Sequence, residues 1–180
     1  MRFLPTILSA AVAAGVLAAC FGSASTPTAS LPGAGAQSRI GPGTTPSNVY
    51  VADKGSSEVT VYNHAFVYQR MITIGVSAPD FVTFDSGENL YVANSKSNTV
   101  TKYSPGGSNP ILVLQGKSIS DPTAVAVDSS FNIYIASTGN DSVRIYDQNA
   151  MLIQTLGAKQ FVGKPRALAF DKNGYLYVTR

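Results

Sequence analysis

The sequence has few of the residues from which catalytic and metal sites are usually assembled. It contains one cysteine, one histidine and no tryptophan. A single cysteine excludes an intrachain disulfide. A multi-histidine metal site cannot be assembled from one histidine, and a Cys–His nucleophilic pair is poorly supported because the sequence offers a single residue of each type. The candidate chemistry is therefore restricted to carboxylates, amides, hydroxyls and lysine or arginine side chains.

Charge is also scarce. Lysine and arginine number 13, aspartate and glutamate number 10, and the formal net charge is +3. Proteins that bind nucleic acid usually concentrate basic residues on one surface, and a balance this small gives no ground for such a partner. Beyond the first twenty residues the sequence shows no helical periodicity, so an all-β chain is predicted for the remainder.

The first twenty residues indicate export. One arginine is followed by a run of leucine, isoleucine, valine and alanine that ends in small residues. This order is typical of a secretory signal peptide, and the run is short for a membrane-spanning helix, which needs about 20 apolar residues. Residues 1–19 are therefore predicted to be a signal peptide and excluded from the fold.

The end of this segment resembles the lipobox of bacterial lipoproteins. The residues that carry the resemblance are Leu17, Ala18, Ala19 and Cys20. In that family the cysteine thiol receives a diacylglycerol, the signal is cut before it and the new amine is acylated, with palmitate among the acyl chains. The resemblance implies Cys20 as the lipidated residue and a membrane as a partner through this anchor. The alternative is an ordinary signal peptide in which Cys20 is incidental.

The lipobox resemblance also implies a location. A lipidated Cys20 places the chain in the bacterial cell envelope, outside the cytoplasm. Phe21 follows the cysteine where the family's inner-membrane retention signal has an aspartate, which favours the outer membrane. All but five of the residues from Phe21 to Pro46 are Gly, Ser, Thr, Pro or Ala. Residues 20–46 are therefore predicted to be a lipidated cysteine and a disordered tether, because such a composition buries too little apolar surface to fold.

Three short elements recur in one order through the rest of the chain. The first ends in an aspartate, the second carries a central tyrosine and the third ends in a tyrosine. The central tyrosines are 41, 43 and 43 residues apart. The first elements are residues 79–85, 122–128 and 165–171; the second are 48–53, 89–94, 132–137 and 175–180; the third are 59–62, 100–103 and 143–146.

Each element is rich in β-branched and aromatic residues and is bounded by turn formers, which predicts strands. A fourth, less regular strand is predicted at residues 71–74, 111–114 and 151–156. Four short antiparallel strands every 40–45 residues are typical of a propeller blade. The predicted fold is all-β: a partial β-propeller of about three four-stranded antiparallel blades over residues 47–180, after a signal helix and a disordered linker.

These elements resemble the NHL-repeat family of β-propellers and its relatives with YVTN-like strands. The resemblance rests on units such as Pro122–Asp128 followed by Asn132–Ala136. It implies that the proline-to-aspartate strand is innermost and that the tyrosine strand is second. The third strand departs from the family pattern, because Glu58, Thr99 and Ser142 lie where many NHL repeats carry arginine.

Three blades are fewer than the four to eight of a typical propeller. The sequence leaves three explanations open. The chain is a truncated product or gene fragment, or two copies complete a six-bladed ring, or the arc persists alone or with another partner. An open arc would expose apolar blade faces and strand edges, both of which favour association.

Repeated polar residues are the remaining candidates for a site. Asp85, Asp128 and Asp171 follow the first strands, and their recurrence at equivalent turns predicts structural capping rather than a carboxylate ring for calcium. Asp53, Asn94 and Ser137 end the second strands and are predicted to form turns. The central tyrosines keep strict register, which suits packing between blades.

Two functions follow from different parts of the sequence, and a third possibility is that the chain is a remnant without an independent function. A repeat scaffold on a tether, without a catalytic triad or a metal-ligand cluster, predicts a membrane-anchored binding or interaction module without catalytic activity and without a cofactor. The alternative is a fragment or half-ring of a metal-dependent propeller enzyme, similar to the lactonases and lyases among related propellers. The sequence names no ligand.

Overall fold

The computed structural model describes residues 36–38, 48–157 and 163–180, and these form an all-β structure. The first blade contains β1 (Ala36–Ser38), β2 (Val49–Asp53), β3 (Glu58–Tyr62) and β4 (Tyr68–Ile72). The second contains β5 (Pro79–Phe84), β6 (Leu90–Asn94), β7 (Thr99–Tyr103) and β8 (Pro110–Leu114).

The third blade contains β9 (Pro122–Val127), β10 (Ile133–Ser137), β11 (Ser142–Tyr146) and β12 (Leu152–Leu156). A 3-10 turn, η1 (Thr138–Asn140), lies between β10 and β11. A two-stranded hairpin follows, formed by β13 (Ala167–Phe170) and β14 (Leu176–Thr179). None of the described residues belongs to a helix long and apolar enough to cross a membrane.

All strand pairs are antiparallel neighbours in sequence, and their register repeats from blade to blade. The central tyrosine of each second strand lies opposite the residue before the last in the third strand: Tyr50 opposite Val61, Tyr91 opposite Lys102 and Tyr134 opposite Ile145. In the hairpin, Tyr177 lies opposite Ala169. The repeat predicted from the sequence is therefore a repeat of structure.

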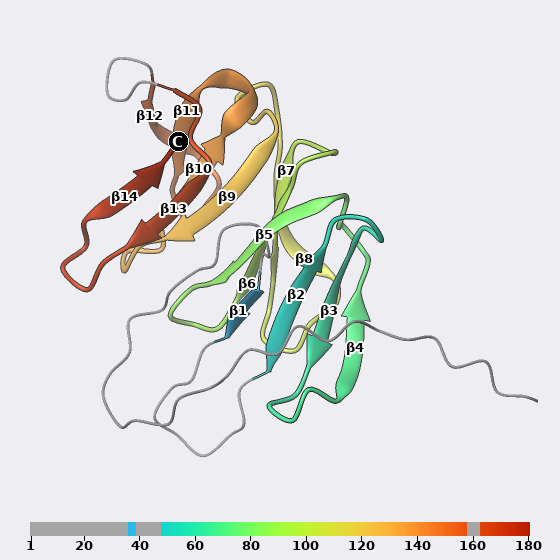
Figure 1. Ribbon diagram of the computed structural model, residues 1–180. Helices are drawn as coiled ribbons and strands as arrows, with labels where there is room; N and C mark the ends of the chain where they lie inside the picture. The colour runs from blue at the N-terminus through green and yellow to red at the C-terminus, as the bar shows by residue number, and fades with distance from the viewer. Residues whose placement is uncertain (1–35, 39–47, 158–162) are drawn as a thin grey trace, which may run out of the picture.

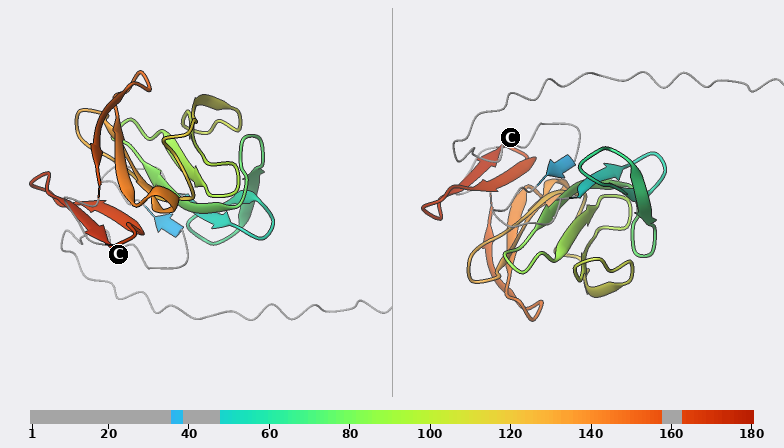
Figure 2. Two further views of the ribbon diagram at one scale, coloured as in Figure 1. Left: turned by 90° about the horizontal axis from the view of Figure 1, so that it is seen from above. Right: turned by 90° about the horizontal axis from the view of Figure 1, so that it is seen from below.

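The four sheets follow one another around an arc (Figure 1). Viewed from above and below, the first blade lies at one end of the arc and the β13–β14 hairpin lies at the other (Figure 2). Successive first strands lie side by side, β1 with β5, β5 with β9 and β9 with β13. Meandering four-stranded sheets arranged radially in this way form a partial β-propeller, and the predicted fold class is confirmed.

Strand β1 is a difference from the sequence prediction, which assigned residues 20–46 to a tether without structure. Ala36, Gln37 and Ser38 pair with Val51, Tyr50 and Val49 of β2. Main-chain hydrogen bonds along a sheet edge do not depend on apolar side chains. A sequence poor in apolar residues can therefore still supply a strand where an edge is open to pair with it, and here it supplies the innermost strand of the first blade.

The core consists of the apolar layers between successive blades. Tyr50, Val59, Val61 and Ile72 of the first blade pack against Val82, Leu90, Val92 and Tyr103 of the second. Further layers join the second blade to the third and the third blade to the hairpin. Alternation along a strand explains this arrangement, because adjacent residues of each second strand face opposite neighbours.

Candidate functional site

The turns of the arc fall into two groups. In an antiparallel meander, successive turns alternate between the two ends of the strands. We call the end with the first-to-second and third-to-fourth strand turns the turn rim; its members are residues 63–67, 85–89, 104–109, 128–132, 147–151 and 171–175. The other end, which we call the loop rim, carries residues 54–57, 95–98 and 138–141 and the connections 73–78 and 115–121.

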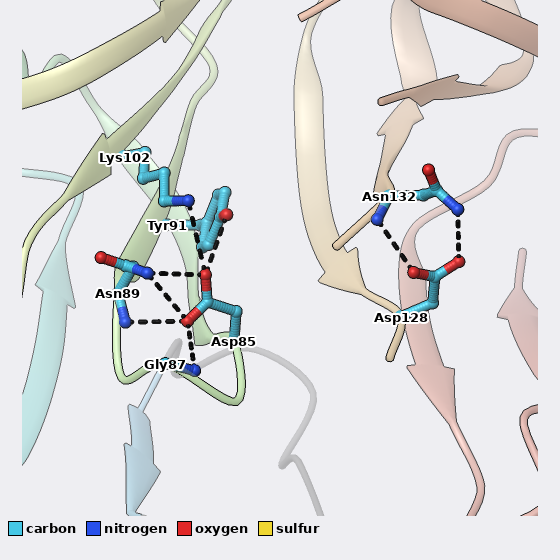
Figure 3. A network of polar contacts seen from close by, with 7 residues as sticks. All are labelled: Asp85, Gly87, Asn89, Tyr91, Lys102, Asp128 and Asn132. Carbon is cyan, nitrogen blue, oxygen red and sulfur yellow. Dashed lines mark hydrogen bonds and ion pairs between the residues drawn. The ribbon is translucent and has the colours of Figure 1, made fainter. Parts of the chain in front are cut away.

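Asp85 is the centre of a polar network on the turn rim (Figure 3). Its Oδ1 accepts hydrogen bonds from the backbone N–H groups of Gly87 and Asn89, both at 2.9 Å. Its Oδ2 accepts from the Asn89 amide at 2.9 Å and from the Tyr91 hydroxyl at 3.1 Å. Lys102 Nζ lies 3.5 Å from the same oxygen, and the Asp85 side chain is fully buried.

The electrostatics of this network favour an ionised carboxylate. Desolvation opposes ionisation of Asp85, but hydrogen bonds from Asn89 and Tyr91 and the charge of Lys102 outweigh it and lower the pKa of Asp85. Burial and the neighbouring Asp85 charge raise the pKa of Tyr91, which keeps its hydroxyl protonated as a donor. The ammonium of Lys102 also lies 5.1 Å from the centre of the Tyr91 ring, within the range of a cation–π contact.

The same turn recurs in the next blade and in the hairpin. Asp128 Oδ1 accepts from the N–H groups of Ser130 at 2.8 Å and Asn132 at 2.9 Å, and Oδ2 accepts from the Asn132 amide at 2.9 Å (Figure 3). Asp171 Oδ1 accepts from Asn173 and Tyr175, both at 2.9 Å. The prediction that the three aspartates cap their turns is confirmed. Within the described ranges, no group of three or more His, Cys, Asp or Glu side chains is arranged to hold a metal ion.

The third-to-fourth strand turns of the first and third blades use the same device, which the sequence analysis missed. Asn63 Oδ1 accepts from the N–H groups of Ala65 at 2.9 Å and Val67 at 3.0 Å. Asp147 Oδ1 accepts from Asn149 at 2.9 Å and Met151 at 2.8 Å. The available signal was an Asn or Asp directly after the tyrosine that ends the third strand.

On the loop rim, Asn94 is completely buried. Its Oδ1 accepts from the N–H of Ser77 at 3.0 Å, and its amide donates to Thr101 Oγ1 at 3.1 Å. Ser137, the equivalent residue in the third blade, accepts from the N–H of Ser120 at 2.8 Å. Each side chain therefore binds the connecting segment that leads into the first strand of its own blade.

The third member of that predicted set behaves differently. Asp53 accepts from the N–H of Ser56 at 2.9 Å within its own turn, and this hydrogen bond lowers the pKa of Asp53. The prediction of turn formers therefore holds for Asp53. It is wrong for Asn94 and Ser137, which bind residues 17 positions earlier in the chain, because the entering connection passes beside the end of the second strand.

Polar contacts on the loop rim also join successive blades. Ser57 Oγ accepts from the N–H of Ala78 at 3.1 Å, and Asn98 Oδ1 accepts from the N–H of Asp121 at 2.7 Å. These four residues all have left-handed backbone conformations, with φ between 45° and 56°. Lys54 Nζ also forms an ion pair with Asp80 of the second blade at 2.7 Å.

The central tyrosines lie between blades. The Tyr50 ring contacts Phe84 of the next blade edge-on, with ring centres 4.9 Å apart, and Tyr134 contacts Phe170 in the same way at 4.9 Å. Tyr91 is buried in the layer between the second and third blades. The prediction of packing between blades is confirmed for these residues, whereas Tyr177 remains 59% exposed.

The predicted lipidation site and lipobox, Cys20 with Leu17, Ala18 and Ala19, lie outside the described residues. The signal peptide 1–19 lies outside them as well, as does the tether apart from Ala36–Ser38. No geometry therefore bears on these predictions.

Comparison with known proteins identifies the fold but no family. No protein family and no curated protein matches the sequence. A streptogramin B lyase structure matches with a TM-score of 0.66 at 10% identity, covering 84% of this chain and 50% of the other. Virginiamycin B lyase from Staphylococcus aureus matches with a TM-score of 0.63 at 10% identity, covering 74% and 45%.

A third solved structure, the WD40 β-propeller domain of Doa1, matches with a TM-score of 0.61 at 12% identity, covering 73% of this chain and 43% of the other. Because all three identities are low, the likeness shows a β-propeller fold alone. The chain spans about half the length of the lyases it matches.

Proposed function

We propose that this chain is a lipid-anchored, extracytoplasmic binding module of the NHL-like β-propeller kind, held at a bacterial membrane through Cys20. The lipobox and the signal-like segment support the anchor, and the repeated strands support the scaffold. The tether between Cys20 and the first blade separates the binding surface from the membrane. The outer membrane is the favoured location, because Phe21 replaces the aspartate of the retention signal.

One observation carries the binding role. The repeated aspartates, which are the strongest candidates for metal ligands, accept hydrogen bonds from their own turns. A carboxylate oxygen saturated by N–H donors has little capacity left for a cation. These residues therefore support the scaffold, and the function belongs to surfaces that vary between blades.

The loop rim is the surface that fits this role best. Its exposed side chains differ from blade to blade and carry both charges, in contrast to the repeated turns of the other rim: Lys54, Lys96, Lys117, Asp121 and Asp141. Loops on a rigid scaffold commonly carry binding residues. A mixed-charge surface of this kind fits a polar partner, such as a protein or a glycan.

Calorimetric titration of the full chain with Ca²⁺ and with Zn²⁺ separates this proposal from the enzyme alternative. We expect no stoichiometric binding of either ion. Stoichiometric binding of either ion that disappears in Asp85→Asn/Asp128→Asn would contradict the binding role and favour a half-ring of a metal-dependent lactonase- or lyase-like enzyme.

Metabolic labelling with radioactive palmitate tests the anchor. The unmodified chain is expected to incorporate label and to fractionate with membranes, while Cys20→Ser loses both properties. Leu17→Arg retains the thiol but damages the recognition segment, so label is expected to fall there too. Persistent labelling of Leu17→Arg would mean that Cys20 is not acylated through a lipobox.

A further inference from the structure

Two groups of exposed apolar side chains lie at the turn rim. Residues 66–68 end the turn between β3 and β4 and begin β4, and residues 151–153 end the turn between β11 and β12 and begin β12. All of these side chains are exposed, Phe66 by 74% and Met151 by 67%. We call the two groups the apolar tips. They lie at the same end of the strands, on the first and third blades.

The two rims differ in the distribution of charge. The apolar tips contain no charged residue, and the exposed charged residues of the turn rim are Glu88 and Lys172. The loop rim has five exposed charged residues, which are the candidates for binding named above. Among the described residues of the loop rim, Ile74 is the only large apolar side chain that is exposed. Exposed apolar side chains and exposed charges therefore concentrate at opposite ends of the strands.

Neither the core nor the turn accounts for the phenyl group of Phe66. The Phe66 backbone N–H donates to the carbonyl oxygen of Asn63 at 2.9 Å, and its φ of 57° is left-handed. Glycine adopts this conformation freely and bulky residues rarely do; Gly174 occupies the equivalent position in the hairpin turn. Because the turn would form more easily with glycine and the side chain is mostly exposed, a contact outside the described residues is the better explanation.

We propose that the apolar tips insert into the interface of the bilayer that holds the chain, so that the turn rim faces the lipid and the loop rim faces away from it. This inference rests on the anchor at Cys20 of the proposed function. Residues 21–35 separate Cys20 from Ala36, and a segment of that length spans at most about 50 Å. A five-residue strand is about 17 Å long, so the turn rim stays within reach of the bilayer.

The short connection also affects the strength of the contact that is needed. A tether raises the effective concentration of one group at another to which it is linked. Apolar side chains on an otherwise polar surface bind the boundary between lipid headgroups and acyl chains in proportion to the apolar area that they bury there. Two small tips can therefore orient a chain that is already held at the membrane, even where they would not recruit it from solution.

A bilayer fits two separated tips better than a protein partner does. The second blade lies between the first and the third, and the residues that lead into its β8, Ser108 and Asn109, are polar. A protein interface has a closely packed apolar centre, which polar residues interrupt here. A lipid interface is continuous and deformable, so that separate aromatic and aliphatic side chains can each enter it.

Quenching of a fluorophore by brominated lipid tests the orientation. The full-length Cys20→Ser chain is attached to vesicles of phosphatidylethanolamine, phosphatidylglycerol and brominated phosphatidylcholine by an N-terminal histidine tag and a nickel-chelating lipid. One introduced cysteine, the only thiol, carries an NBD label. Ala65→Cys places the label on the turn rim, and Ser56→Cys places it on the loop rim at the opposite end of β3. We expect quenching several times greater at position 65 than at position 56.

Two variants separate the tips from the rest of the rim. Phe66→Gly/Val67→Ser/Met151→Ser should abolish the difference between positions 65 and 56 without lowering the thermal melt, because glycine suits the left-handed turn position. Glu88→Gly makes the same kind of backbone change on the same rim and should preserve the difference.

Three results would overturn the proposal. One is equal or greater quenching at position 56, and another is a difference that persists in the triple variant. The third is no quenching at either position, which would leave the tips to a protein partner. Because the tag attaches the chain in place of a lipid, these results do not depend on acylation of Cys20, and a failure here is distinguishable from a failure of the palmitate test.

Discussion

Asp85 shows how a single residue decides local geometry in this repeat. Its two carboxylate oxygens receive donors from the turn backbone, an amide and a phenol, with a lysine nearby. The equivalent Asp171 receives two backbone donors at 2.9 Å, and a tyrosine hydroxyl lies farther away at 3.5 Å. The backbone contacts are common to both turns. The closer tyrosine hydroxyl, the amide and the lysine are additional contacts of Asp85, which is buried between blades.

Asp85→Ala should therefore destabilise the fold more than Asp171→Ala. Removing a buried acceptor leaves several donors unpaired, and we expect a loss of about 2–4 kcal/mol in the free energy of unfolding. Asp171→Ala should cost less, because water can replace its contacts. Urea denaturation of both variants measures the difference, and equal losses would show that burial of the Asp85 network adds nothing.

The Asp85 network also predicts a pH dependence. Because the pKa of Asp85 is lowered in the folded state, its contribution to stability is present above the unfolded pKa of about 3.9 and is lost as pH falls through the folded value. The stability difference between the unmodified chain and Asp85→Asn should shrink between pH 6 and roughly pH 3. Urea midpoints across this range test it, and a constant difference would contradict an ionised Asp85.

The aspartate turns also place one residue in the left-handed backbone conformation. Glu88 and Gly174 occupy equivalent positions in the aspartate turns, with φ of 63° and 84°. Both residues are exposed, and a Cβ at Gly174 would meet no atom within 4 Å. Glu88→Gly should raise the free energy of unfolding by about 0.5–1 kcal/mol, and Gly174→Glu should lower it similarly, because only glycine adopts this conformation freely. Thermal melts of the two variants should shift in opposite directions, and shifts of the same sign would refute the explanation.

At the scale of elements, regular strands were easier to predict than irregular ones. The second strands were predicted within one or two residues, since their tyrosines and β-branched neighbours repeat closely. The fourth strand of the first blade begins at Tyr68 and ends at Ile72, earlier than the predicted 71–74. Its register shifts opposite Tyr62, and such an irregularity leaves no periodic signal. Strand β1 was missed because pairing with β2 determines it.

The candidate site was predictable only in part, for a related reason. Asp85, Asp128 and Asp171 were identified as turn caps because their contacts are local in sequence. The contacts of Asn94 and Ser137, and the ion pair between Lys54 and Asp80, join segments 17 to 26 residues apart. Their partners depend on how the connections pass over the loop rim, and a repeat pattern contains no information about that path.

The buried side chain of Asn94 should contribute to the stability of the second blade. Asn94→Ala removes a buried acceptor for Ser77 and buried donors to the third strand, and should lower the free energy of unfolding by about 2–3 kcal/mol. Asp53→Ala, at the equivalent but less buried position, is the matched control and should have a much smaller effect. Chemical denaturation of both variants checks this, and comparable losses would show that Asn94 acts only within its own turn.

At the scale of the whole molecule, the chain is a series of similar layers. Each layer consists of the facing residues of two successive blades, so each blade depends on its neighbours for burial, as in other repeat proteins. The hairpin packs against the third blade, and its Tyr175 and Tyr177 are 67% and 59% exposed. Stability should therefore be unequal along the chain, with the second blade best protected because a four-stranded blade covers each of its faces, whereas only the two-stranded hairpin covers one face of the third blade.

Hydrogen–deuterium exchange of the full chain, followed by mass spectrometry, tests most directly whether burial between blades stabilises the fold. We expect the slowest exchange in β6 and β7, slow exchange in β10 and β11, and faster exchange in the β13–β14 hairpin, because amide protection follows burial between blades. Exchange in β6 and β7 as fast as in the hairpin would contradict this expectation, because the blades would then not form packed layers with their neighbours.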